Sequence, residues 1–234
     1  MSIARTLYSV FAILFLSSCA SEYRIHGSSS VSRLDGKMLF VKIPQGGEMI
    51  KVDSAEVVHG LFRMQGEIDS AMIASLYMDE QSILPLVVEK GNIQVQIDNG
   101  RLTVSGTPLN DRLYDFVSKK NSLDDRAYEV ERLESRMIMD GKPMEEVEAE
   151  ITREREKLSE EMDGLVKTFI QANYENVLGP GIFIMLCNGF PYPLMTPLLE
   201  EIVDNAPETF KNHDLVKEYI EAARSNSEIL NAER

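Results

Sequence analysis

The sequence contains few of the residues on which most metal and redox sites depend. Its 234 residues include only two cysteines and three histidines. Two cysteines cannot form a disulfide framework or a four-thiolate zinc site. The histidines, His26, His59 and His213, lie far apart, so none forms the closely spaced pair that a helical metal site needs. The sequence therefore predicts no metal ion and no cofactor.

Positive charge is also scarce. The chain has 24 Lys and Arg residues against 38 Asp and Glu residues, which gives a net charge of −14. Phosphate binding requires clustered Lys and Arg, so nucleic acid is excluded as a partner. The remaining composition, 44% hydrophobic and 26% charged, is typical of a folded protein of one or two domains.

Motifs of the common enzyme classes are missing as well. The chain has no Gly-rich phosphate loop, no Gly-x-Ser-x-Gly elbow, no His-Glu-x-x-His and no Cys-x-x-Cys. Cys187 lies in an apolar stretch without a neighbouring cysteine or histidine, which favours a buried, inert thiol over a reactive thiolate. We therefore predict no catalytic residues. A hydrolase built from scattered carboxylates is the alternative.

The N-terminal residues carry the most specific signal. Arg5 is the only charged residue before Glu22, and an apolar run covers residues 7–16. This run is shorter than the roughly 18 residues that a membrane-spanning helix needs. A basic start, a short apolar segment and small residues after it are typical of a secretory signal peptide.

The signal ends in the tetrad Leu16-Ser17-Ser18-Cys19, which resembles the bacterial lipobox. In a lipobox the cysteine becomes the first mature residue and carries acyl chains, and several chains together anchor a protein firmly to a membrane. We predict a signal peptide over residues 1–18, lipid attachment at Cys19, and a lipid-anchored N-terminus with the first strand over residues 19–30. This interpretation places the protein at an envelope membrane, the outer membrane, facing the periplasm or the cell surface. An ordinary cleaved signal with an incidental Cys19 is the alternative.

Residues 22–106 follow a period of two. Leu39, Val41 and Ile43 alternate with their neighbours, as buried and exposed positions of a strand do. Asn99-Gly100 lies between two such runs and predicts a hairpin. About eight short strands separated by turn signals predict an antiparallel β-sandwich or barrel-like domain.

After Thr107-Pro108 the period changes to 3.6. Helical faces recur through residues 107–224, and Gly141 followed by Pro143 separates two long helices. Residues 225–234 lack an apolar stripe and are predicted to be loose. The fold class is therefore α+β, with a β domain followed by a helical region.

The second long helix, residues 144–169, alternates acidic and basic side chains. This pattern favours a solvated face crossed by i,i+4 ion pairs, and a coiled-coil seam for a partner is the alternative. The first helix has an apolar face that needs cover, so we expect the β unit not to be fully separable from the helices.

Two short repeats, Asp53-Ser54-Ala55 and Asp69-Ser70-Ala71, resemble the acceptor for envelope O-glycosylation in Bacteroidetes. Asp-Ser is also ordinary turn chemistry. Ser54 and Ser70 are therefore candidate glycosylation sites only where they lie in an exposed loop.

Four longer segments occur in a characteristic order. They are Val52-Asp53-Ser54-Ala55-Glu56-Val57, Gly60-Leu61-Phe62-Arg63-Met64-Gln65-Gly66, Val88-Glu89-Lys90-Gly91 and Val104-Ser105-Gly106-Thr107-Pro108-Leu109-Asn110-Asp111. The series is similar to a domain of unknown function, DUF4369, of Bacteroidetes envelope lipoproteins of the thiol:disulfide interchange type. The resemblance implies a β-rich domain leading into helices, with Gly60, Gly66, Gly91 and Gly106 at turns.

In the longer members of that family a thioredoxin fold with Cys-x-x-Cys follows the helices. This sequence has no such pair, so it resembles the domain without its catalytic partner. Two hypotheses follow. The first is a non-enzymatic envelope lipoprotein, a binding or interaction module that binds a ligand or an envelope protein through its β domain or its helices. The second is an accessory or truncated partner of an envelope thiol-disulfide oxidoreductase system.

Overall fold

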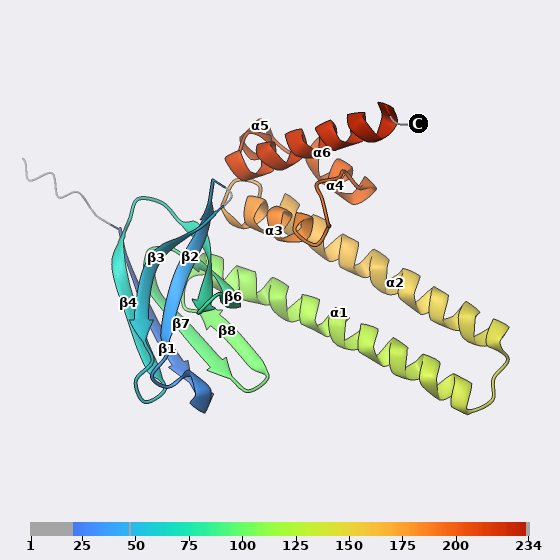
Figure 1. Ribbon diagram of the computed structural model, residues 1–234, viewed down its shortest axis with the longest axis horizontal. Helices are drawn as coiled ribbons and strands as arrows, with labels where there is room; N and C mark the ends of the chain where they lie inside the picture. The colour runs from blue at the N-terminus through green and yellow to red at the C-terminus, as the bar shows by residue number, and fades with distance from the viewer. Residues whose placement is uncertain (1–20, 47, 233–234) are drawn as a thin grey trace, which may run out of the picture.

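The computed structural model describes residues 21–46 and 48–232, in which eight strands are followed by helices (Figure 1). The strands are β1 (Ser21–Ser29), β2 (Met38–Gln45), β3 (Glu48–Glu56), β4 (Leu61–Ile68), β5 (Met72–Met78), β6 (Gln81–Val88), β7 (Gly91–Asp98) and β8 (Arg101–Ser105). The helices are α1 (Pro108–Met139), α2 (Met144–Gln171), α3 (Leu178–Cys187), α4 (Pro197–Asp204), α5 (Glu208–Lys211) and α6 (Asp214–Ala232), with a short 3-10 turn η1 (Ser32–Leu34). The α+β class predicted from the sequence is confirmed.

The strands form two four-stranded sheets that pack into a sandwich. One sheet has the order β4-β1-β7-β8 and the other β3-β2-β5-β6. Neighbouring strands are antiparallel, except that β1 and β7 are parallel. The sandwich is therefore the predicted one with a single parallel pair, because β1 is inserted between β4 and β7, strands that come much later in the chain.

The alternation of side chains along the strands separates core from surface as predicted. In β7, Ile93, Val95 and Ile97 are buried, whereas Gln94 and Gln96 are exposed. Their buried side chains join one apolar cluster that fills the space between the sheets. Such burial contributes about 25 cal/mol per Å² of apolar surface.

Gly66 differs from its expected role at a turn. It lies inside β4, opposite Tyr23 of β1. A Cβ atom at this position would lie 2.8 Å from the Tyr23 hydroxyl oxygen. Glycine is therefore needed here to make room for the tyrosine ring, not to reverse the chain.

Helices α1 and α2 form an antiparallel hairpin that projects from the sandwich (Figure 1). Gly141, with φ +73°, lies in the reversal between them. Val130 of α1 packs with Val147, Ile151 and Leu158 of α2. The apolar stripe predicted for the second long helix is thus covered by α1 of the same chain, and its charged residues remain at the surface.

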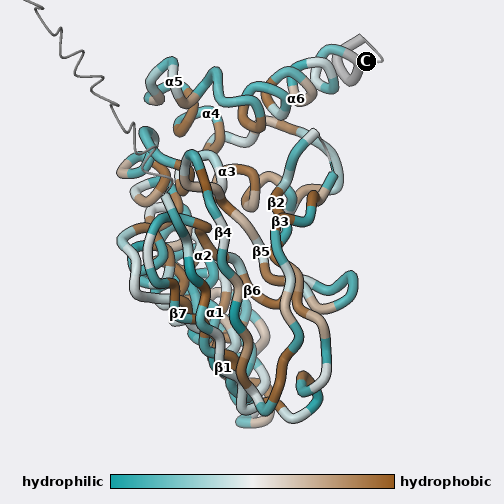
Figure 2. Tube along the Cα trace, turned by 90° about the vertical axis from the view of Figure 1, so that its left-hand side faces the viewer, coloured by the Kyte–Doolittle hydropathy of each residue, from teal (hydrophilic) through white to brown (hydrophobic). Residues whose placement is uncertain are grey.

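The C-terminal helices gather at one end of the sandwich (Figure 2). Their core contains Phe183 of α3 and Phe210 of α5, whose rings pack edge to face with their centroids 5.6 Å apart. Gly181 of α3 lies against Ile73 of β5, where a Cβ atom would come within 2.9 Å of the Ile73 side chain. Helices and sheets therefore share a packed boundary. In the described part of the chain, no helix is both long and apolar enough to cross a membrane.

The prediction of a loose segment from Ser225 is wrong as far as residue 232, because α6 continues to Ala232. The Asn226 side chain donates to the carbonyl of Pro193 at 2.8 Å, and Ser227 Oγ donates to the Ala223 carbonyl at 3.0 Å. The Asn226 contact holds the helix against the preceding loop, whereas the Ser227 contact lies within α6. A helix end held by hydrogen bonds does not need an apolar stripe, so the lack of a stripe after Ser225 was not evidence against a helix.

Candidate functional site

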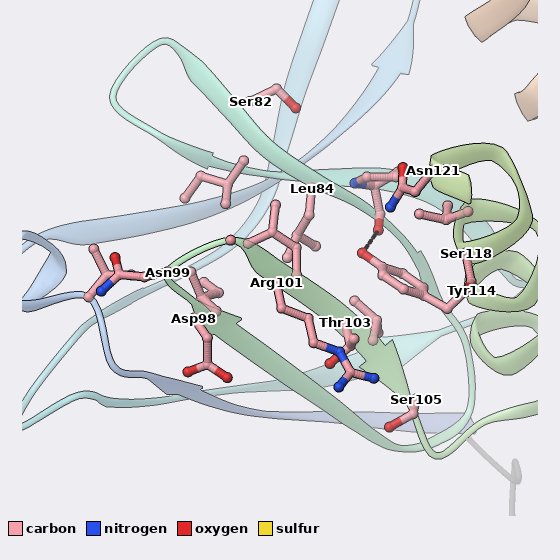
Figure 3. Close-up of a pocket in the computed structure, with 18 of the residues that line it drawn as sticks. Ser82, Leu84, Asp98, Asn99, Arg101, Thr103, Ser105, Tyr114, Ser118 and Asn121 are labelled. Carbon is pink, nitrogen blue, oxygen red and sulfur yellow. Dashed lines mark hydrogen bonds between the residues drawn. The ribbon is translucent and has the colours of Figure 1, made fainter. Parts of the chain in front are cut away.

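An open groove lies at one side of the sandwich, between the edge strands β6 and β8 and the first half of α1 (Figure 3). Its volume is about 1180 Å³. Ligand pockets commonly measure roughly 300–1,000 Å³, so the groove is large enough for a peptide or a sizeable small molecule.

The groove has an apolar floor and a polar rim. Leu34, Leu84 and Val104 are buried beneath it. Polar side chains come from β8 and α1, as Figure 3 shows; they include Arg101, Thr103, Ser105, Ser118 and Asn121. An apolar floor with polar groups around it is typical of a binding surface.

The acidic groups of the groove are mostly engaged. Asp98 accepts hydrogen bonds from Ser30 Oγ and Gln96 Nε2, both at 2.7 Å. Asp111 accepts one from the backbone N–H of Gly106 at 2.9 Å. Among the described residues, neither Arg101 nor Arg33, which also lines the groove, forms an ion pair.

The edge of β6 is closed by two side chains of α1. Tyr114 donates its hydroxyl to the Pro85 carbonyl at 3.0 Å. Asn110 accepts from the Val87 N–H at 2.8 Å and donates to the Val87 carbonyl at 2.7 Å, as a neighbouring strand would. Desolvation raises the pKa of the Tyr114 hydroxyl well above its usual range, so it remains a donor at neutral pH. Helix α1 therefore substitutes for a further strand at β6.

A buried polar network joins the start of α1 to the sandwich. Glu89 is 8% exposed, and its Oε1 accepts from the backbone N–H groups of Leu109 at 2.8 Å and Asn110 at 3.0 Å. A carboxylate is favourable at a helix N-terminus because it satisfies unpaired N–H groups and the helix dipole. Thr107 accepts from the Asn110 side chain at 2.9 Å. These residues connect the two parts of the fold.

Sequence reasoning did not identify Glu89 and Asn110 as partners. Both fall in the segments that carry the family resemblance, residues 88–91 and 104–111. Their separation of 21 positions hides the contact, since neither strand nor helix periodicity relates them. The one available signal was Glu89 itself, a carboxylate that directly follows an apolar strand. Carboxylates are rarely buried unless they have a partner.

Cys187 lies at the end of α3 and is 2% exposed. Burial raises the pKa of its thiol to about 12. A thiol with so high a pKa remains protonated at neutral pH and is a poor nucleophile. This agrees with the inert thiol expected from the sequence.

The three histidines lie on separate elements. His26 is in β1, His59 is in the turn before β4, and His213 directly precedes α6. Across residues 21–46 and 48–232, no three His, Cys, Asp or Glu side chains are grouped closely enough to hold a metal ion. His213 Nδ1 is buried and has no hydrogen-bond partner among the residues that the structure describes, and it lies beside a smaller hollow of about 540 Å³.

The predicted modification sites fall in different surroundings. Cys19 and the signal peptide over residues 1–18 lie outside the described residues. Ser54 is in β3, half-buried and paired with Phe40. Ser70 is exposed in the turn between β4 and β5. Only Ser70 meets the condition of an exposed loop.

The comparisons with known proteins concern the β domain. Residues 23–113 match the model of a family described as a domain of unknown function, DUF4369. The match begins at Tyr23 of β1 and ends at Leu113 of α1, so it includes the sandwich and the residues that attach α1 to it. A search of curated proteins gave no match.

Proposed function

We propose that this chain is a non-enzymatic binding module of the cell envelope, anchored through Cys19, whose partner occupies the groove between β6, β8 and α1. The groove itself is the observation that carries the proposal. It combines a volume of about 1180 Å³, a buried apolar floor and an exposed polar rim, and most of its lining lies within residues 23–113, which match the DUF4369 model. These features are typical of a surface that binds a ligand.

The lining of the groove supports binding over catalysis. The described residues that line it are mainly apolar, hydroxyl, amide and charged side chains, with neither histidine nor cysteine among them. Two of its carboxylates, Asp98 and Asp111, accept hydrogen bonds from neighbouring donors, and the third, Asp125, is exposed on α1. A general acid or base needs a group poised to exchange protons near neutral pH, and Tyr114, with its raised pKa, is not such a group.

A second candidate function is an accessory role beside an envelope thiol-disulfide oxidoreductase. The match of residues 23–113 to DUF4369 favours it, since the series of segments resembles the domain that such enzymes carry before a thioredoxin fold. In this role the groove would receive part of the enzyme, and the redox-active cysteines would belong to the partner.

Capture from envelope extract tests both functions. Ser118 is exposed on α1 and lines the groove, so Ser118→Trp should fill it and abolish capture of the partner. Ser135→Trp is the matched control, because Ser135 is exposed on the same helix away from the groove. Equal capture by the wild type and both variants would contradict the groove as the binding site. A captured protein with Cys-x-x-Cys would favour the second function.

A further inference from the structure

We propose that the partner binds as an extended peptide that adds a strand to the open edge of β8. This inference rests on the proposed function of the groove and specifies its ligand. Among the described strands, β8 (Arg101–Ser105) lies at a sheet edge and pairs with β7 alone. The groove lies along it, so an additional strand has both space and a pairing surface.

The register identifies the backbone groups that face this edge. The Ile97 carbonyl accepts from the Ser30 N–H at 3.1 Å, on the side of β7 that faces β1. Backbone groups alternate along a strand, so Gln96 and Asp98 point to β8, where they pair with Thr103 and Arg101. The N–H and C=O groups of Leu102 and Val104 therefore point away from β7, toward the open side.

The neighbouring edge shows what an occupied edge looks like in this protein. Across the groove, the Pro85 carbonyl and both backbone groups of Val87 are bonded by Tyr114 and Asn110 of α1. In the described part of the chain, no side chain is hydrogen-bonded to Leu102 or Val104 in this way. An extended backbone offers donors and acceptors that alternate along its length, and it pairs with such an edge at an inter-strand distance of about 4.8 Å.

The side chains of β8 specify the chemistry of the peptide. Arg101, Thr103 and Ser105 share one face of the strand, and the Arg101 guanidinium reaches along this face in Figure 3. Because Arg101 has no ion-pair partner among the described residues, a carboxylate across from it would be favoured. On the other face Leu102 is 39% exposed and offers an apolar contact. The expected ligand alternates acidic or hydroxyl side chains with apolar ones.

A synthetic peptide tests this pairing directly. The probe is an end-blocked peptide of sequence Thr-Val-Glu-Val-Thr-Val, compared with the same peptide carrying Lys in place of Glu and with one N-methylated at its valines. Titration of the full mature chain is followed by amide NMR and hydrogen exchange. We expect the Glu peptide to bind and to slow exchange of the Leu102 and Val104 amides, the Lys peptide to bind about fivefold more weakly, and the methylated peptide not to bind.

Two substitutions separate the backbone and charge contributions. Leu102→Pro removes one edge-facing donor, as proline already does at Pro85 on the opposite edge, and should weaken binding about tenfold. Leu102→Ala keeps the N–H and is the matched control, with only a small loss. Arg101→Glu should reverse the preference so that the Lys peptide binds more tightly. Thermal melting of each variant checks that the fold is retained.

Several outcomes would overturn the inference. Binding of the Glu peptide that is unchanged by Leu102→Pro, protection of amides in another strand, or no shift at millimolar peptide would each do so. Slow exchange of the Leu102 and Val104 amides without peptide, in a chain that sediments as a dimer, would identify a second copy as the occupant. If Ser118→Trp abolishes partner capture but Leu102→Pro does not, the proposed function stands and the strand-addition inference fails.

Discussion

The attachment of α1 to the sandwich predicts a large effect for Asn110→Ala. Asn110 is fully buried and forms four side-chain hydrogen bonds, two of them with the backbone of Val87. Val87 is also fully buried, so after truncation its N–H and C=O have no water to replace the lost partner. Each buried unsatisfied group costs about 1–3 kcal/mol, which gives a loss of about 2–6 kcal/mol in the free energy of unfolding. Typical domains have about 5–15 kcal/mol in total.

Urea denaturation of the mature protein measures this loss. Asn121→Ala is the matched control, since Asn121 is exposed on the same helix and should change the free energy of unfolding by less than about 0.5 kcal/mol. Asn110→Asp should be at least as damaging as Asn110→Ala, because a second oxygen then faces the Val87 carbonyl and the Glu89 carboxylate. If Asn110→Ala unfolds at the same midpoint and slope as the wild type, the hydrogen bonds at β6 do not hold the helix to the sheet and the reasoning is wrong.

Four further outcomes are expected. Cys19→Ala should abolish acylation and release the protein into the soluble fraction, and an unmodified N-terminus in the wild type by mass spectrometry would contradict the lipobox. Burial raises the pKa of Cys187 to about 12, so between about pH 9 and this value the thiol ionises only in the unfolded state. The free energy of unfolding should therefore fall more steeply with rising pH in the wild type than in Cys187→Ala. Equal slopes would argue against burial of the thiol. Residues 21–106 alone should unfold at lower denaturant than the full mature chain, because the β6 edge then lacks its cover from α1; equal midpoints would indicate an autonomous β domain. Any O-linked sugar should be lost in Ser70→Ala and retained in Ser54→Ala, and glycopeptide mapping that places the sugar on Ser54 would refute the exposure criterion.

Local periodicity was enough to predict the two halves of the fold. Alternation with a period of two, interrupted by signals such as Asn99-Gly100, predicted about eight strands, and the structure has eight in its described residues. The change to a period of 3.6 after Thr107-Pro108 coincides with the start of α1 at Pro108. Both signals are local, since each depends on side chains that lie within a few positions of one another.

The end of the last helix was missed for a related reason. Asn226 ties the last part of α6 to the preceding loop through a hydrogen bond to the carbonyl of Pro193, 33 positions away. An amphipathic pattern reports apolar burial alone, so a helix end fixed by polar contacts has no such pattern.

The sequence by itself determined the strands, the helices, the buried thiol and the absence of the common catalytic motifs. Only the tertiary structure decided that Asn110 and Tyr114 close the edge of β6 while β8 remains open beside a groove, and that Ser70 but not Ser54 lies in an exposed turn. These features depend on pairs such as Asn110 with Val87, which are 23 positions apart and meet only after two sheets and a helix have packed. Periodicity records which face of an element is buried, but the identity of the element that buries it is set by long-range packing.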